Sequence, residues 1–258
     1  MIADTEQTKR TLSPFAVGGF VLALLAGLAE IAAGWGTRWG FWDYRGGFFI
    51  LRFAAYAGIA CGVLSLIGCA ATWPGSSRRG IVWAAAGLLI ALIVVFVPWS
   101  AGQRARQVPA IHDITTDPEN PPRFAALLAV RNASANKAEY GGAEVAAKQR
   151  AAYPDIVPLE LAVPPGRAFA LAADAARSLG WQLADADEKE GRIEATDTTF
   201  WFGFKDDIVI RITPTARGSR VDVRSVSRVG RSDLGTNAKR VRGYLKKILE
   251  LRGKPAAQ

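Results

Sequence analysis

The sequence predicts a membrane-anchored α+β protein, in which three transmembrane helices precede a small α+β sandwich with an antiparallel sheet flanked by helices. The N-terminal part contains three long apolar runs almost free of charge, whereas the residues after Gln103 mix polar and apolar side chains as a globular domain does. Hydrophobic residues make up 50% of the 258 residues, which is high for a soluble chain of this length. We therefore expect two parts that fold in two different solvents.

The apolar runs each have the length of a membrane-spanning helix. They cover residues 14–35, 47–73 and 80–99. About 20 apolar residues suffice to cross a hydrocarbon core of about 30 Å as a helix. The runs end at Trp35, Trp73 and Trp99, which suits aromatic anchoring at the headgroup level. The first run is too long for a signal peptide and lacks a small-residue cleavage pattern, so we expect it to be retained.

The remaining chain divides around these spans. The expected parts are an N-terminal tail, a linker, a globular domain and a C-terminal tail, over residues 1–13, 103–109, 110–253 and 254–258. An odd number of spans puts the two ends of the chain on opposite sides of the membrane. The basic residues that flank the spans are Lys9, Arg10, Arg78 and Arg79 on one side and Arg38, Arg45, Arg104 and Arg106 on the other. Because the two sides carry equal numbers, the positive-inside rule does not orient the protein.

Two charged residues lie within the expected spans. Glu30 is five residues from the end of the first span, and Arg52 is five residues from the start of the second. Since consecutive spans are antiparallel, both charges fall at a similar depth, roughly 7 to 8 Å from the same interface. We expect a membrane ion pair. A functional role is one interpretation, and a pair that pins the helical hairpin near the headgroups is the simpler one.

The globular part shows helical and strand periodicities in a clear order. A helix is expected over 141–153 and another over 166–181, then strands over 191–199, 206–215 and 219–229, and a last helix over 237–252. The inward positions predicted for the second of these helices are Phe169, Ala172, Ala173, Ala176 and Leu179. Those of the last helix are Ala238, Val241, Leu245, Ile248 and Leu249, with Lys239, Arg240, Lys246 and Lys247 outward. This order predicts helices that cover one face of an antiparallel sheet.

The net charge of +9 does not indicate nucleic-acid binding. Acidic residues are concentrated in the first part of the globular region and basic residues in its last third, so the two halves attract each other. No interleaved aromatic and basic motif of an RNA-binding module is present. We expect internal ion pairs and no nucleic-acid partner.

Four separated blocks resemble a known family. They cover residues 109–124, 153–161, 201–212 and 221–245, and together they resemble the bacterial and plastid family DUF1499, a domain of unknown function, over about residues 108–251. The three-span N-terminal region resembles membrane-anchored members from Gram-negative bacteria. This resemblance implies an integral protein of the inner (cytoplasmic) membrane, in the cell envelope. Plastid relatives associated with the thylakoid lumen imply a C-terminal domain on the periplasmic side. The resemblance implies no reaction.

His112 is the only histidine of the chain. With Asp113 and Asp117 beside it, it is a weak candidate for a general base. Zinc and similar metals require several nitrogen or sulfur ligands, and the globular part has no second histidine and no cysteine. We therefore expect no metal and no cofactor, and a histidine that braces an extended segment. The alternative is a hydrolase-type envelope enzyme that uses His112 and Asp113.

The adjacent acids Asp206 and Asp207 precede a strand pattern. Neighbouring strand residues point to opposite faces, so the two carboxylates should not form a catalytic pair. We expect one of them to face arginines of the neighbouring strand.

The stretch from Ser225 to Asn237 predicts a turn between a strand and the last helix. Candidate ligand-binding residues in and beside it are Arg224, Arg228, Arg231, Ser232 and Asn237. Free amides at a helix start next to guanidinium groups can bind a phosphate, an anionic lipid headgroup or a carboxylate. The competing interpretation is that Arg228 and Arg231 pair with aspartates of residues 111–117 or 204–207.

Three functions remain open at this point. The preferred one is an extracytoplasmic domain that acts as a binding or assembly module for an anionic envelope component, in a protein whose spans have the lipid bilayer as their partner. The others are the hydrolase and a purely structural partner of another membrane protein, contacting it through residues 200–204 and the spans.

Overall fold

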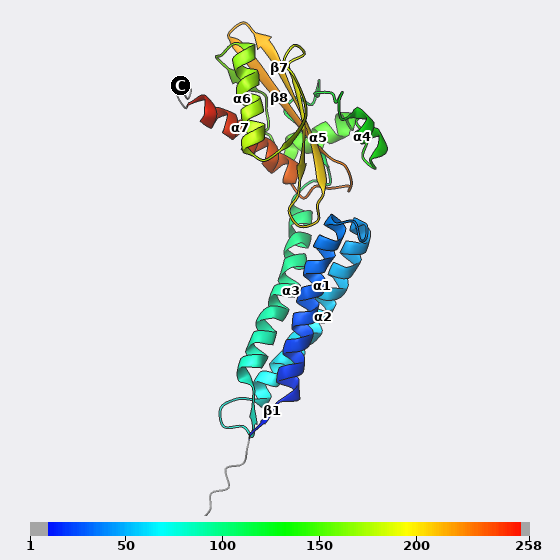
Figure 1. Cartoon of the computed structure of the whole chain (residues 1–258), viewed down its shortest axis with the longest axis vertical. Helices are drawn as coiled ribbons and strands as arrows, with labels where there is room; N and C mark the ends of the chain where they lie inside the picture. The colour runs from blue at the N-terminus through cyan, green and yellow to red at the C-terminus, as the bar shows by residue number, and fades with distance from the viewer. Residues whose placement is uncertain (1–9, 254–258) are drawn as a thin grey trace, which may run out of the picture. The chain divides into compact units, whose positions relative to one another are not determined.

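A computed structural model describes residues 10–253 (Figure 1). The chain forms two compact units, the first of Met1–Gln103 with Trp201–Gly203 and the second of the remaining residues. Lys9 and most of the two expected tails lie outside the described residues.

The first unit contains three long helices. They are α1 (Pro14–Arg38), α2 (Tyr44–Ala71) and α3 (Ile81–Gln107), joined at one end by a two-residue parallel pairing of β1 (Thr11–Leu12) with β2 (Arg78–Arg79). All three are long and apolar enough to span a membrane, as the sequence predicts. Helix α3 continues past Pro98 to Gln107, so most of the expected linker is helical. The helix ends two residues before Pro109, whose ring disfavours further helix.

Small residues let these helices approach each other closely. A Cβ atom on Gly68 of α2 would lie 2.8 Å from the Cα of Ala16 in α1, and one on Gly87 of α3 would lie 2.8 Å from the Cα of Phe20. Such contacts between small residues are the usual basis of helix packing in membranes, where apolar surface alone does not drive association.

The second unit is built on an antiparallel sheet. Its strands are β3 (Asp113–Thr115), β4 (Leu159–Leu161), β5 (Gln182–Asp187), β6 (Arg192–Thr198), β7 (Lys205–Thr215) and β8 (Gly218–Ser227). The order is β3-β8-β7-β6-β5, and β4 also pairs with β8, at Val221–Ser219. The three predicted strands correspond to β6, β7 and β8. The short edge strands β3 and β4 have three residues each, too few to show a periodicity, and β5 carries no fully buried side chain to mark its inner face.

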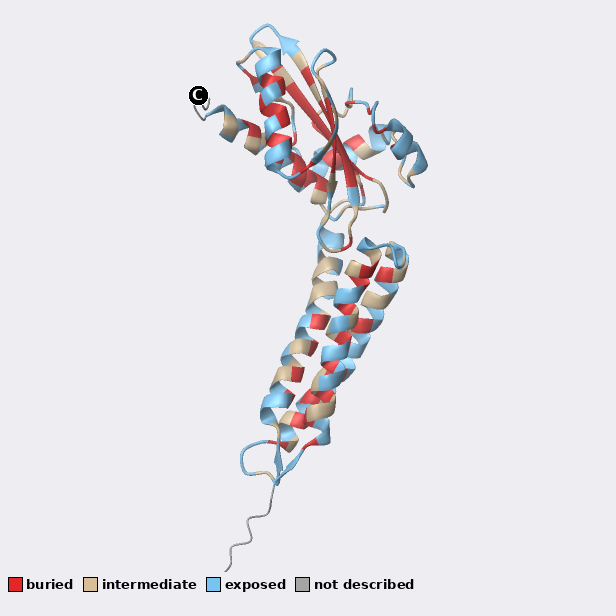
Figure 2. Cartoon of the chain, in the orientation of Figure 1, coloured by how far each residue is buried: buried red, intermediate tan, exposed pale blue. Residues whose placement is uncertain are grey.

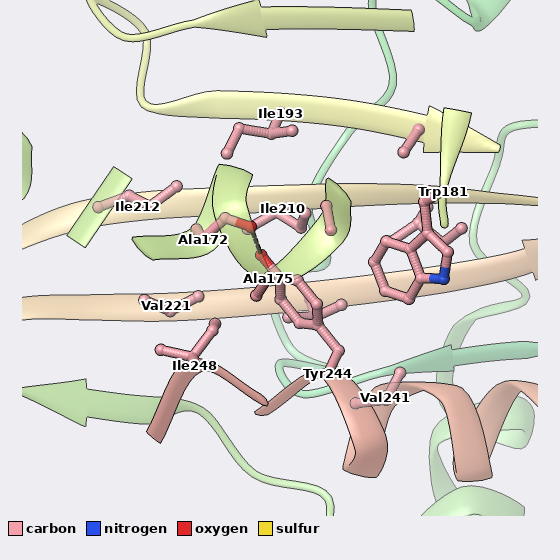
Figure 3. Packing of buried hydrophobic residues seen from close by; sticks show 14 of the residues in the cluster. Ala172, Ala175, Trp181, Ile193, Ile210, Ile212, Val221, Val241, Tyr244 and Ile248 are labelled. Carbon is pink, nitrogen blue, oxygen red and sulfur yellow. Dashed lines mark hydrogen bonds between the residues drawn. The ribbon is translucent and has the colours of Figure 1, made fainter. Parts of the chain in front are cut away.

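Two helices cover one face of the sheet and enclose the core. Helices α6 (Pro165–Ser178) and α7 (Thr236–Arg252) pack on the isoleucines and valines of β6, β7 and β8. Figure 3 shows Tyr244 of α7 stacked on Trp181, with its hydroxyl donating a hydrogen bond of 2.9 Å to the carbonyl of Ala172 in α6. One side of α6 is buried (Figure 2), and most of its buried residues are alanines, whose small side chains let the helix lie close to the strands.

Three predicted positions on these helices differ in the structure. Leu179 is 37% exposed because α6 ends at Ser178 and Leu179 follows its last turn. On α7, Leu249 is 42% exposed, whereas Tyr244, which was not among the predicted inward positions, is fully buried. Arg240, predicted to face outward, is buried because two carboxylates of the sheet lie beneath it.

The other face of the sheet is covered by an irregular segment, residues 116–140, which includes the short helix α4 (Leu128–Ala133). Only a few apolar side chains pack there, namely Phe124, Leu127, Val209 and Val226, with Ala138 at their edge. Helix α5 (Gly142–Ala152) follows, where the sequence predicts a helix. The side-chain amide of Gln149 on α5 binds both the amide and the carbonyl of Thr115 in β3. Helix α5 thus contacts the edge strand β3 through a buried polar side chain, and its Val145 packs against the core under α6 and α7.

Candidate functional site

The turn between β8 and α7 is closed by the side chains of the chain itself. The carboxylate of Asp233 accepts hydrogen bonds from the amides of Gly235 and Asn237, at 2.9 and 2.7 Å. The hydroxyl of Ser232 accepts a bond from the amide of Leu234. The predicted free amides at the start of α7 are therefore capped, and a ligand would have to displace Asp233 to reach them.

Asn237 is fully buried, and its side chain links three segments of the chain. Its amide nitrogen donates to the carbonyl of His112 at 2.9 Å and to the hydroxyl of Ser227 at 3.0 Å, and its oxygen accepts from Ser225 at 2.8 Å. Asn237 thus ties the start of α7 to the end of β8 and to the chain entering β3.

Arg224 is bound on all sides by protein atoms. Its Nε and Nη2 atoms form a bidentate pair with the carboxylate of Asp113, at 3.0 and 2.7 Å. Two further N–H groups donate to the carbonyls of Pro122 and Ala138. Both charged side chains are at most 5% exposed. A bidentate pair of this kind fixes geometry, and four of the five N–H groups of Arg224 donate to protein atoms.

Arg228 is also paired, with Asp207. Its guanidinium donates to both carboxylate oxygens, the shortest distance being 2.8 Å. The same carboxylate accepts from Thr196 at 2.8 Å and lies 3.4 Å from Nη1 of the fully buried Arg131. Burial lowers the pKa of Arg131, and the charge of Asp207 opposes that shift. Arg228 thus pairs with an aspartate of residues 204–207, as the competing interpretation has it, and Arg224, which that interpretation did not name, is paired with Asp113 as well.

The two adjacent acids of β7 point to opposite faces, as predicted. Asp207 lies under the irregular segment, whereas Asp206 lies under α7 and pairs with Arg240 at 2.6 Å. More generally, acids of the first part of the unit meet basic residues of the last third. The pairs are Asp113–Arg224, Asp117–Arg211, Asp117–Arg220, Asp155–Arg242, Asp197–Arg240, Asp206–Arg240 and Asp207–Arg228.

Arg231 is the exception among the predicted arginines. Within residues 10–253 no carboxylate pairs with it, and it lines a cleft of about 290 Å³. The other polar side chains around this cleft are His112, Asp113, Asn136, Lys137, Glu139, Glu144 and Lys148. Lys148 pairs with Glu144 at 2.6 Å, and the Lys137 ammonium donates to the carbonyl of Asn132. The structure therefore brings His112 and Arg231 to one cleft and leaves Arg228 outside its lining.

A comparison with protein families matches residues 113–248 to the model described as "Protein of unknown function (DUF1499)". The chain belongs to the DUF1499 family. A search of curated proteins finds no match. The DUF1499 region extends from β3 into α7, so it contains the whole sheet and the charged pairs around Asp113 and Asp207.

Two buried polar side chains of the second unit, from here on the DUF1499 unit, were not predicted from the sequence as buried contacts. Glu194 of β6 accepts hydrogen bonds from the amides of Ala125, Ala126 and Leu127, just before α4. Arg131 of α4 reaches Asp207 and the carbonyls of Val226 and Lys137. The available signal was the strand period, because Glu194 alternates with the buried Ile193 and Ala195 and must face the other side of the sheet.

The DUF1499 unit offers little for catalysis at His112. Asp113 is next in the chain, but both of its oxygens are bound by Arg224. Among residues 10–253, no group of three or more histidine, cysteine, aspartate or glutamate side chains is arranged to hold a metal ion.

The expected membrane ion pair is not formed. Glu30 is buried in the first unit, and its Oε1 atom has no hydrogen-bond partner. Arg52 is exposed and its guanidinium lies over the rings of Phe49 and Phe53, at 5.7 and 5.4 Å. The sequence correctly places both charges inside apolar helices, but the rotation of α2 directs Arg52 onto aromatic rings of its own helix.

Proposed function

We propose that this DUF1499 protein is an integral inner-membrane protein whose globular domain lies on the periplasmic side and works as a binding or assembly module. The ligand is an anionic envelope component, held in the cleft beside His112 and Arg231. The three span-length helices support a membrane location. The choice of membrane and side rests on the resemblance to membrane-anchored members of the family in Gram-negative bacteria.

Arg231 is the observation that carries the binding proposal. Arg220, Arg224 and Arg228 precede it in the chain and each has a carboxylate partner, whereas Arg231 has none within the described residues. It lines the cleft together with Lys137 and Lys148. A guanidinium that is not neutralised internally presents a planar set of donors that matches a phosphate or a carboxylate.

The acidic side chains of the cleft restrict the ligand further. Glu139 and Glu144 line it as well, so basic side chains exceed acidic ones by only one when the Asp113–Arg224 pair is set aside. A simple anion would meet repulsion from these carboxylates. The cleft therefore favours a ligand in which a hydrogen-bond donor, such as a hydroxyl or an amine, lies next to the anionic group.

Binding fits the surroundings of His112 better than hydrolysis does. A catalytic histidine is normally oriented by a carboxylate, and the adjacent Asp113 is fully engaged by Arg224. The carbonyl of His112 accepts bonds from Ser227 and Asn237, which gives this residue a role in joining β3 to the turn before α7.

The binding proposal can be tested with two small probes, inorganic phosphate and glycerol 3-phosphate. The full chain in a neutral detergent is titrated with each, and binding is followed by ³¹P NMR. We expect saturable binding, tighter for glycerol 3-phosphate, that Arg231→Ala weakens at least roughly tenfold because a charged hydrogen bond contributes about 1.5 to 3 kcal/mol. The matched control is Arg217→Ala, an exposed arginine in the turn between β7 and β8. No binding by the wild type, or equal loss in both variants, would refute the cleft as an anion site.

The location is tested separately. Compartment-dependent reporters are placed after Gln258 and within residues 75–79, between α2 and α3. We expect them to report opposite sides, with the C-terminal reporter in the periplasm. A cytoplasmic C-terminal reporter would overturn the envelope location and direct the ligand search to cytosolic phosphates.

A further inference from the structure

The hairpin turns of the sheet differ sharply in chemistry. The turn between β5 and β6 contains Glu188, Lys189, Glu190 and Gly191, and the turn between β7 and β8 contains Ala216 and Arg217. The turn between β6 and β7, residues 199–204, reads Thr-Phe-Trp-Phe-Gly-Phe. Turns in water are normally formed by small and polar residues. Four aromatic residues in one turn therefore indicate that this end of the sheet is not simply solvated.

The aromatic turn is a well-defined structure. The last strand pair, Thr198 with Lys205, is followed by a backbone hydrogen bond of 2.8 Å from Thr199 to Phe204. The hydroxyl of Thr199 accepts a second bond, from the amide of Phe204, at 2.9 Å, and Gly203 has a φ of +66°. The turn is thus closed by its own hydrogen bonds, and Phe200 is 77% exposed at its tip.

Strand register places this turn at the end of the sheet where the chain enters from the spans. Asp113, the first residue of β3, pairs with Val226, which pairs with Asp207, which pairs with Thr196 at the end of β6. The two polar turns lie at the opposite ends of these strands, because neighbouring strands are antiparallel. The sheet is therefore aromatic at its chain-entry end and polar at the other.

The connection from α3 to this end of the sheet is short. Helix α3 ends at Gln107 and β3 begins at Asp113, so the connecting chain spans no more than about 20 Å. Trp99 marks the expected headgroup level on α3, and the polar residues 100–107 continue the helix for roughly 12 Å. Covalent connectivity thus limits how far β3 can lie from the end of α3.

We propose that the turn of residues 199–204 inserts Phe200 into the interfacial layer of the membrane that α1, α2 and α3 cross. Aromatic residues partition to this layer, and a neighbouring basic residue suits the phosphate level. Lys205, which follows the turn, is exposed. The spans carry their own exposed aromatic residues at the end where α1 and α3 finish, among them Trp39, Phe41 and Trp99. Trp201 and Phe202 of the turn belong to the first unit, where the indole of Trp201 donates a hydrogen bond of 3.2 Å to the carbonyl of Ile31 and the ring of Phe202 lies 5.1 Å from that of Phe48. The partner proposed for the exposed Phe200 is the lipid bilayer, on the side that holds the globular domain. This proposal does not depend on the anion cleft.

The test uses the full chain reconstituted in liposomes, with Cys61→Ala and Cys69→Ala to remove the native thiols. Phe200→Cys is labelled with the environment-sensitive fluorophore NBD, and emission is measured with lipids that carry a doxyl quencher near the headgroup or deep in the acyl chain. The matched control is Ala216→Cys in the same background, because Ala216 is exposed in the polar turn at the other end of the sheet. Circular dichroism checks that both labelled proteins keep the helical and strand content of the parent.

We expect label at position 200 to emit at shorter wavelength than label at 216, and to lose intensity mainly with the headgroup-proximal quencher. Aqueous iodide should quench position 216 and spare position 200. Equal iodide quenching at both positions would overturn the proposal, since Phe200 would then face water. A blue-shifted label at 200 that neither doxyl lipid quenches would also overturn it, because position 200 would then pack on protein instead of lipid.

Discussion

At the scale of single residues, the DUF1499 unit uses arginine–carboxylate pairs where most domains of this size use apolar packing. Arg131, Arg224, Glu194, Asp207 and Asp222 are all essentially buried, on the face of the sheet that the segment 116–140 covers. Buried charges of this kind are costly to desolvate, so each depends on its partner. This dependence makes individual pairs testable.

Removing one charge of the Asp113–Arg224 pair should destabilise the unit strongly. We expect Asp113→Asn to lower the free energy of unfolding by about 3 to 5 kcal/mol, because it leaves Arg224 buried without a counter-charge. The double variant Asp113→Asn with Arg224→Met should recover much of this loss. Urea titration of the full chain in detergent, read by pulse proteolysis, measures both. Asp174→Asn is the control, since the exposed pair of Asp174 with Arg177 should contribute no more than about 1 kcal/mol. Equal effects of Asp113→Asn and Asp174→Asn would contradict the interpretation.

Asp233 should give an unusual pH dependence of stability. Burial raises the pKa of Asp233 above its usual 3.8, although the amides of Asn237 and Gly235 oppose the shift. The folded state therefore binds the proton more tightly than the unfolded state. The contribution of Asp233 to the free energy of unfolding should increase as the pH falls through the raised pKa, and level off below about 3.8.

The measurement is the difference in unfolding free energy between the wild type and Asp233→Asn over a pH series. Asp155→Asn provides a control of opposite sign, because the hydrogen bond from Arg242 lowers the pKa of Asp155. Stability contributed by Asp155 should be lost as the pH falls. If both differences change in the same direction, the assigned environment of Asp233 is wrong.

At the scale of secondary-structure elements, the inner face of α6 consists mainly of alanines. Its inner positions carry small side chains, and Ala172 is fully buried where the hydroxyl of Tyr244 meets its carbonyl (Figure 3). The helix could not lie as close to β7 with larger residues there. The stripe of small residues in the sequence predicts α6 and its inner face. The sequence does not predict that Tyr244 is the large side chain of α7 that packs against this face.

Enlarging the inner face of α6 should destabilise the unit. We expect Ala172→Leu to lower the free energy of unfolding by about 1 to 3 kcal/mol, because overpacking forces neighbours out of their preferred rotamers. Ala170→Leu on the exposed side of the same helix should change stability by no more than about 0.5 kcal/mol. Hydrogen–deuterium exchange of peptides from β7 and β8 measures the change in stability of both variants. Similar protection in the two variants would mean that α6 does not pack as described.

At the scale of the whole molecule, the two units bury different kinds of residue. The spans expose large apolar side chains outward, such as Leu25, Phe49 and Val82, and bury glycine and alanine between helices. The globular unit buries isoleucine and valine instead. Each pattern matches its solvent, since lipid provides no hydrophobic drive for helix association and water does.

The packing of the spans should therefore depend on particular glycines. A side chain at Gly68 would lie 2.8 Å from the backbone of Ala16, whereas one at Gly18 would meet nothing within 4 Å. We expect Gly68→Leu to lower the temperature at which the full chain in detergent loses protease resistance between α1 and α2, and Gly18→Leu to leave it unchanged. Equal midpoints for the two variants would show that α1 and α2 do not pack through Gly68.

Local patterns in the sequence determined the three spans, the helices α6 and α7, the three long strands and the opposite directions of Asp206 and Asp207. Span length, helical stripes and strand alternation all arise from neighbouring residues, so they can be read without knowing the fold. Only the tertiary structure decided which arginine meets which carboxylate, that Glu30 and Arg52 stay apart, and that His112 and Arg231 share a cleft. These outcomes depend on strand register and helix rotation between residues far apart in the chain, as with Asp113 and Arg224, which no local pattern encodes.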